Sequence, residues 1–89
     1  MQKKFDKANI KYTSEVPLTI NYKDDYKFKR YADFLVDDEV VLEIKRGKRL
    51  CGKDFDQTYE YLKILNQKLG LLVLFAPEEV KIHRVLNLY

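Results

Sequence analysis

Apolar and polar residues alternate along several short stretches of the chain. Residues 16–22 carry an apolar side chain at every second position, a period that is typical of a half-buried β-strand. Residues 71–75 form a continuous apolar run, which indicates a strand buried on both faces. The remaining apolar-rich stretches predict three further strands, at 27–36, 40–45 and 80–86. The last of them alternates through Val80, Ile82 and Val85.

A single long helix is predicted at residues 55–69. Its apolar residues recur every three or four positions, at 55, 59, 62, 65 and 69, which places them along one helix face. Asp54 is suited to cap the N-terminus and Gly70 to follow the C-terminus. Residues 2–9 fit the last turns of a helix or a loose arm, and residues 23–25 fit a turn. The element order predicts an α/β (α+β) fold, in which the helix packs on a mixed five-stranded sheet.

The hairpin that follows residue 36 decides which side chains share a face of the sheet. A two-residue turn would place Asp33 and Glu43 on opposite faces, whereas a three-residue loop at 37–39 would place both carboxylates on one face. We expect the three-residue loop. The other face would then be wholly apolar, and we expect the helix to cover it at residues 34, 36, 40, 42 and 44.

Two carboxylates and a lysine stand inside these apolar strands. Ionised side chains are seldom buried unless they are paired or bind a metal. Asp33 and Glu43 offer the oxygen ligands that Mg²⁺ or Mn²⁺ takes, the carbonyl of Ile44 could supply a third, and two adjacent carboxyls should have raised pKa values. Lys45 could orient a water molecule or stabilise charge on a phosphate. The alternative is an exposed cross-strand ion pair that contributes about 0.2–1 kcal/mol.

Length and composition restrict the class of protein. The 89 residues suit one small domain, expected to span residues 1–89. There are 17 Lys and Arg against 14 Asp and Glu, and this excess of +3 permits a nucleic-acid partner without requiring one. No apolar run approaches the roughly 20 residues of a membrane span, no signal-peptide core follows the N-terminus, and Cys51 is the only cysteine. We therefore expect a cytoplasmic protein with neither a disulfide nor a structural zinc site.

Asp33 followed by Glu43-Ile44-Lys45 resembles the motif of the PD-(D/E)xK nuclease superfamily. The flanking sequence is most similar to the family named GxxExxxY, over stretches that extend from residue 16 to residue 85. The resemblance implies a restriction-endonuclease-like core and a metal-dependent nuclease. It also implies that Asp33 and Glu43 bind the metal and that Lys45 is catalytic.

Two residues of the predicted helix extend this resemblance. Gln57 and Tyr61 are similar to the Gln-x-x-x-Tyr element of the RecB-like branch, in which the pair lies beside the site and contacts DNA or water. For Gln57 an equal alternative is a capping box with Asp54, and Tyr61 could equally be a core residue with its hydroxyl at the edge. The helix that gives the family its name motif has no counterpart in this chain, and Ala32 takes the place of the usual proline.

A basic segment joins the predicted site strand to the helix. Its cations could bind the phosphates of nucleic acid near the helix N-terminus: Arg46, Lys48, Arg49 and Lys53. The alternative is a solvated loop without a ligand. Lys23, Lys27, Lys29 and Arg30 are interpreted as charges that favour solubility rather than as a second binding groove.

Three hypotheses about function follow. The first is a Mg²⁺-dependent nuclease, with DNA as the expected nucleic acid. The second is a nucleic-acid-binding module that has the fold without the catalysis. The third is a homo-oligomer, in which a face or edge left bare by the missing helix pairs with a copy of itself. The second and third can coexist, and the sequence does not decide between single-stranded and double-stranded substrates.

Overall fold

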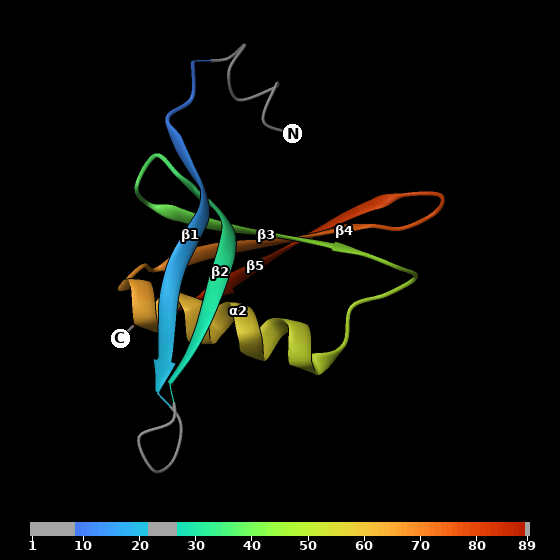
Figure 1. Cartoon of the computed structure of the whole chain (residues 1–89). Helices are drawn as coiled ribbons and strands as arrows, with labels where there is room; N and C mark the ends of the chain where they lie inside the picture. Colours follow the sequence, from blue (N-terminus) through green and yellow to red (C-terminus); the bar gives the residue numbers. More distant parts are fainter. Residues whose placement is uncertain (1–8, 22–26, 89) are drawn as a thin grey trace.

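The computed structural model describes residues 9–21 and 27–88, which form five strands and one helix (Figure 1). The elements are β1 (Tyr12–Asn21), β2 (Lys27–Val36), β3 (Val40–Arg46), α2 (Gly52–Leu65), β4 (Leu69–Phe75) and β5 (Val80–Leu86). The predicted bounds of β2 and β5 are confirmed, whereas β1 and β4 begin earlier than predicted, at Tyr12 and Leu69. The predicted turn at 23–25 and residues 2–8 lie outside the described residues.

The five strands form one mixed sheet in the order β1-β2-β3-β4-β5. Neighbouring strands are antiparallel except for β3 and β4, which run parallel because the chain crosses over between them through α2. Figure 1 shows α2 lying across one face of the sheet. The predicted α+β fold is therefore confirmed.

A three-residue loop connects β2 to β3, as predicted. Val36 pairs with Val40, and the Glu39 amide donates a hydrogen bond to the Val36 carbonyl at 3.0 Å. Asp37 and Asp38 adopt φ angles of 55° and 54°, in the left-handed region that aspartate tolerates better than most residues. Two consecutive aspartates therefore favour the loop that fixes the register of this hairpin.

The helix covers the opposite face of the sheet from the one we predict. It packs into a core with residues of β1 to β5: Val16, Leu18, Ala32, Val41, Leu72 and Val85. A second cluster lies on the other face of β2, β3 and β4: Phe34, Leu42 and Val73. The expected cover over residues 34, 36, 40, 42 and 44 is therefore wrong. Hydrophobicity favours the face of Leu42 and Ile44, yet α2 packs on the face of Val41 and Glu43. The side of the sheet on which the β3–α2–β4 crossover runs therefore decides the covered face.

Strand β2 is irregular at Asp33. Residues 32 and 35 of a regular strand would point to opposite faces, yet Ala32 and Leu35 both belong to the core beneath α2. Across the ladder, Glu15 lies between the β1 partners of Ala32 and Phe34 and has a positive φ of 51°. Such local irregularities re-aim side chains and end strand pairing. Asp33 therefore lies at a bend of β2.

Both predicted ends of the helix are wrong. Cys51 is the N-cap, and Asp54 occupies the third helical position, where its Oδ2 accepts a hydrogen bond from the Cys51 amide at 2.9 Å. Asn66 ends the helix in the left-handed conformation, with φ 55° and ψ 44°. Gly70 lies in β4 instead, where an added Cβ would be only 3.1 Å from Cγ2 of Thr58. Its small size therefore permits the close approach of α2 to the sheet.

Strand β5 is less buried than its alternating pattern predicts. Val85 belongs to the core, but Val80 and Ile82 are 54% and 63% exposed. They lie on the face that α2 does not cover, opposite Phe75 and Val73 of β4. The described residues include no helix with the length and apolar character needed to cross a bilayer.

Candidate active site

The candidate site lies where β2 and β3 part. The registered pairs between these strands end at Phe34 and Leu42, while β3 continues beside β4 as far as Arg46. Beyond that point the Asp33 side chain replaces the main-chain partner, because its Oδ2 accepts a hydrogen bond from the Ile44 amide at 2.8 Å. The bend in β2 therefore opens the sheet and fixes Asp33 beside β3.

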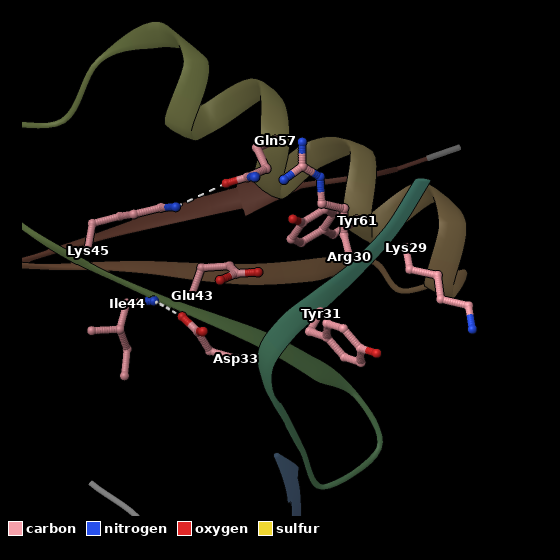
Figure 2. A pocket seen from close by; sticks show the side chains of 9 residues that line it. All are labelled: Lys29, Arg30, Tyr31, Asp33, Glu43, Ile44, Lys45, Gln57 and Tyr61. Atoms are coloured by element: carbon pink, nitrogen blue, oxygen red, sulfur yellow. Dashed lines mark hydrogen bonds between the residues drawn. The ribbon is translucent and has the colours of Figure 1, made fainter. Parts of the chain in front are cut away.

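A cavity of about 340 Å³ fills this opening (Figure 2). It is lined by residues 29–31 and Asp33 of β2, residues 43–45 of β3, and Gln57 and Tyr61 of α2. The structure thus brings together all the residues that sequence analysis predicts as catalytic or metal-binding. They come from three elements that the β3–α2–β4 crossover and the hairpin hold against one another.

Glu43 is the most unusual residue of the cavity. Its side chain is buried, with 3% of the residue exposed, and its Oε1 has no hydrogen-bond partner among the described residues. Burial, followed by a hydrogen bond with Asp33 and the charge of that residue, raises the pKa of Glu43 to about 8, although the charge of Lys45 partly offsets this. An unsatisfied buried carboxyl is costly, and a bound cation would satisfy it.

The donor set fits a hard divalent cation. Asp33 and Glu43 contribute carboxylate oxygens to one cavity, and the main chain of Ile44 lies beside them. In the part of the chain that the structure describes, no group of three or more His, Cys, Asp or Glu side chains gathers. An ion held here would therefore take its other ligands from main-chain oxygen, water or substrate, as Mg²⁺ commonly does.

Lys45 and Gln57 are joined across the cavity. The Nζ of Lys45 donates a hydrogen bond to Oε1 of Gln57 at 3.0 Å, which Figure 2 shows as a dashed line. The capping-box alternative for Gln57 is wrong, because Asp54 occupies the third helical position and accepts the bond from the N-cap. The amide of Gln57 therefore fixes the position of the lysine ammonium group.

Tyr61 is both a core residue and part of the cavity wall. It is 3% exposed and packs in the cluster beneath α2, and it also lines the cavity. Burial raises the pKa of Tyr61, and the negative charge of Glu43 adds to the effect, while Arg30 lowers it. Tyr61 therefore packs in the core, as one interpretation of the sequence has it, and also lines the cavity, where a functional contact is possible.

The cations of the basic segment lie outside this cavity. Arg46, Lys48, Arg49 and Lys53 are exposed, and none of them lines it. Lys48 lines a separate cavity of about 300 Å³ together with residues 76–79. The structure therefore places these four residues on the surface around the β3–α2 connection, away from Asp33 and Glu43.

Residues 29–31 of β2 are cavity residues that sequence analysis does not identify. Arg30 pairs with Leu18 of the core and precedes buried Ala32 by two positions, so it points toward the helix side of the sheet. The alternation of residues 30 and 32 can be read from the sequence. The bend at Asp33, which makes this segment a wall of the cavity, cannot be read from it.

Comparison with known proteins agrees with this fold. A family model described as "PD-(D/E)XK nuclease superfamily" matches residues 1–85. The crystal structure of a protein named SSO0001 has the same fold, with a TM-score of 0.74 and 24% sequence identity over 97% of this chain. The matching region is 47% of SSO0001, so this chain spans about half the length of that protein. No curated protein matches the sequence significantly.

Proposed function

The chain belongs to the PD-(D/E)XK nuclease superfamily, and from that premise we propose that it is a metal-dependent nuclease that hydrolyses phosphodiester bonds of DNA. Members of the superfamily generally use divalent metal ions. The observation that carries the proposal is Glu43, a buried carboxyl with an unsatisfied oxygen next to Asp33. We propose Mg²⁺ as the ion, with Mn²⁺ as a substitute.

Asp33, Glu43 and the carbonyl of Ile44 are the proposed metal ligands. When bound, the ion would polarise the phosphate and lower the pKa of a water molecule. The hydrogen bond from the Ile44 amide holds one carboxylate oxygen of Asp33, so this ligand is oriented before any ion arrives. Because Glu43 is buried, water screens its electrostatic interactions less than those of an exposed carboxylate.

Lys45 is proposed to stabilise the negative charge that develops on the phosphate. Its ammonium group lines the same cavity as the two carboxylates and is held at 3.0 Å from Gln57. Gln57 is thus proposed as a positioning residue. Tyr61, which also lines the cavity, is proposed to contact the nucleic acid or a water molecule beside the phosphate.

The finer relationship is also part of the proposal. Gln57 and Tyr61 are one helical turn apart on α2 and both line the cavity, which supports a place in the RecB-like, GxxExxxY-type branch. Residues 1–89 are proposed to act as a single nuclease domain. The exposed cations Arg46, Lys48, Arg49 and Lys53 are proposed to contact phosphates outside the cavity, with an affinity that falls as salt rises.

A cleavage assay with matched variants tests the proposed function. The purified protein would be incubated with single-stranded and duplex DNA in Mg²⁺ or Mn²⁺, beside Glu43→Gln and the control Glu39→Gln, which changes an exposed acid of the nearby loop. We expect cleavage by the parent, loss of about 100-fold or more in Glu43→Gln, and parental activity in Glu39→Gln. Cleavage of no substrate, or equal cleavage by parent and Glu43→Gln, would contradict the proposal.

A second proposal, assembly with a copy of the chain, is favoured by β5. This strand ends the sheet, and three of its apolar residues are more than half exposed: Val80, Ile82 and Leu86. An edge strand with exposed apolar side chains can pair with another chain. Homo-oligomerisation would leave the cavity untouched, because β5 contributes no residue to it.

A further inference from the structure

One wall of the cavity has no role in the proposed reaction. Lys29, Arg30 and Tyr31 line the same space as Asp33 and Glu43, from the part of β2 that has left its ladder with β3. In Figure 2, Arg30 extends from β2 toward α2, and Tyr31 and Lys29 project from the strand on the other side. The wall thus offers two cations and an aromatic ring within a few residues of the proposed metal ligands.

Arg30 is available to bind an anion. Within residues 9–21 and 27–88 the ion pairs are Lys11 with Asp38 and Lys81 with Glu79, so neither Arg30 nor Lys29 has an acidic partner there. The guanidinium lies near enough to Tyr61 to lower its pKa. A guanidinium binds phosphate oxygens through two parallel hydrogen bonds, which makes arginine suited to holding a phosphate in a fixed orientation.

The charge balance of the cavity favours a polyanion. Its cationic side chains are Lys29, Arg30 and Lys45, and its acidic ones are Asp33 and Glu43. A divalent ion on the two carboxylates would neutralise them and leave three cations in excess. More than one phosphate is then expected to bind, one at the proposed metal centre and its neighbour on the β2 wall.

Tyr31 adds a surface for a base. It is 57% exposed and lies two residues before Asp33, in the cavity wall. Aromatic side chains stack on bases of any identity. In a duplex the bases are stacked inside and the sugar-phosphate backbone lies outside. A base of the nucleotide held by Arg30 can therefore reach the Tyr31 ring, which projects on the other side of β2, only if it has left the stack.

We infer that Arg30 and Tyr31 bind the nucleotide next to the cleaved bond, Arg30 through its phosphate and Tyr31 through its unstacked base, so that the site takes single-stranded nucleic acid. The inference rests on the proposed nuclease function and narrows its substrate. Arg30 and Tyr31 touch substrate and not the metal. Their loss weakens substrate binding and leaves metal binding intact.

Fluorescence anisotropy tests this inference by measuring the binding of a fluorescent 12-nucleotide DNA, either single-stranded or closed into a duplex hairpin. The measurement is made in Ca²⁺, and gels check that the DNA is not cleaved. We expect the parent to bind the single strand at least about tenfold more tightly. Tyr31→Ala should bind the single strand roughly 5- to 100-fold more weakly, and Tyr31→Phe should bind like the parent. Arg30→Ala should weaken binding of both forms, with partial recovery in Arg30→Lys.

Two controls match these changes in type. Tyr59→Ala removes an exposed tyrosine of α2, and Arg84→Ala removes an exposed arginine of β5; neither residue lines the cavity. Both should bind DNA like the parent. Parental binding by Tyr31→Ala, an equal loss in Tyr59→Ala, a preference of the parent for the duplex, or no binding of either form would overturn the inference.

A separate readout distinguishes failure of this inference from failure of the proposed function. The rise in Tm on adding Mn²⁺ should be the same in the parent, Arg30→Ala and Tyr31→Ala, since neither side chain is a proposed ligand. A protein that binds single strands through Tyr31 but cleaves nothing would defeat the nuclease proposal and support the binding wall. A protein that cleaves duplex and single strands equally, with the same activity in Tyr31→Ala, would support the nuclease proposal and defeat the binding wall.

Discussion

Glu43 shows most clearly how one residue can link the fold to its chemistry. Folding places this carboxyl under α2 with an unsatisfied oxygen, an arrangement that costs stability unless a proton or a cation is bound. The raised pKa of about 8 reflects the free-energy cost of ionising Glu43 in this buried position. A residue kept at such a cost is a candidate for function.

The stability of the metal-free protein should therefore fall as pH rises. The ordinary pKa of 4.5 applies in the unfolded chain and about 8 in the folded one, so between these values the folded state holds one more proton and unfolding becomes easier with increasing pH. In EDTA, Glu43→Gln should match the parent near pH 5. It should exceed the parent by on the order of a few kcal/mol in free energy of unfolding at pH 9, a gain of several degrees in Tm.

Thermal or urea unfolding across this pH range measures the effect. The control Glu39→Gln removes an exposed acid and should keep the parental pH dependence. Since a metal must displace the proton of Glu43, Mn²⁺ affinity should also rise with pH up to about 8. The same slope of stability against pH in the parent and in Glu43→Gln would show that Glu43 is not the titrating group.

Gln57 should affect the catalytic rate more than substrate binding. Without its amide, Lys45 loses the bond of 3.0 Å that holds its ammonium group in the cavity. We expect Gln57→Ala to lower kcat by roughly tenfold with little change in KM, since a misplaced charge weakens transition-state stabilisation. The control Gln67→Ala removes an amide that bonds to the Asp38 carbonyl, outside the cavity, and should leave kcat unchanged. An equal effect of both variants would assign Gln57 a structural role only.

Sequence reasoning identified some of these residues and missed others for physical reasons. Asp33, Glu43 and Lys45 stand out because charges inside apolar strands demand an explanation. Arg30 and Tyr31 do not stand out, because a basic, aromatic strand end is ordinary on a surface. They become cavity residues only through the bend at Asp33, which depends on tertiary packing rather than on local pattern.

At the scale of elements, the contact of α2 with β4 supports the site. A Cβ at Gly70 would lie 3.1 Å from Thr58 Cγ2 and 3.3 Å from Leu62 Cδ2, so Gly70→Ala should push the helix away from the sheet. We expect a loss of about 1–3 kcal/mol in free energy of unfolding. Adding Thr58→Ser, which removes Cγ2, should restore part of it. Urea titration measures the change.

Gly52→Ala is the matched control for this prediction. An added Cβ there meets nothing within 4 Å, and the residue begins α2, so the substitution should be neutral or slightly stabilising. A loss of stability as large as that of Gly70→Ala would contradict the contact explanation, because a Cβ at Gly52 has no neighbour to meet.

The sequence predicts the strands and the helix themselves. It predicts less well the residues at which the helix ends and the face of the sheet that the helix covers. Alternation located β1 and β5, a continuous apolar run located β4, and apolar-rich stretches located β2 and β3. The helix ends were wrong because Asp54 and Gly70 have common capping roles, while the structure uses Cys51 and Asn66 as caps. The covered face was wrong because the more apolar side of β3, with Leu42 and Ile44, is not the side on which α2 packs. The chain crossover sets that side, and the local pattern does not reveal it.

At the scale of the whole molecule, the sheet has one face under α2 and one face outside its cover. Ile82, 63% exposed on the second face, should contribute to self-association at the β5 edge. Sedimentation equilibrium should show the parent as a concentration-dependent oligomer and Ile82→Lys shifted toward monomer. Lys81→Gln, on the other face of the same strand, should behave like the parent. A parent that is monomeric at micromolar concentration would contradict the assembly proposal.

Asp33 and Glu43 are proposed to hold one divalent cation at the opening between β2 and β3. A crystal soaked in Mn²⁺ and measured for anomalous scattering tests it directly. We expect a peak within coordination distance of both carboxylates, with the Ile44 carbonyl or water completing the shell. No peak at saturating Mn²⁺, or a peak that neither carboxylate reaches, would contradict it.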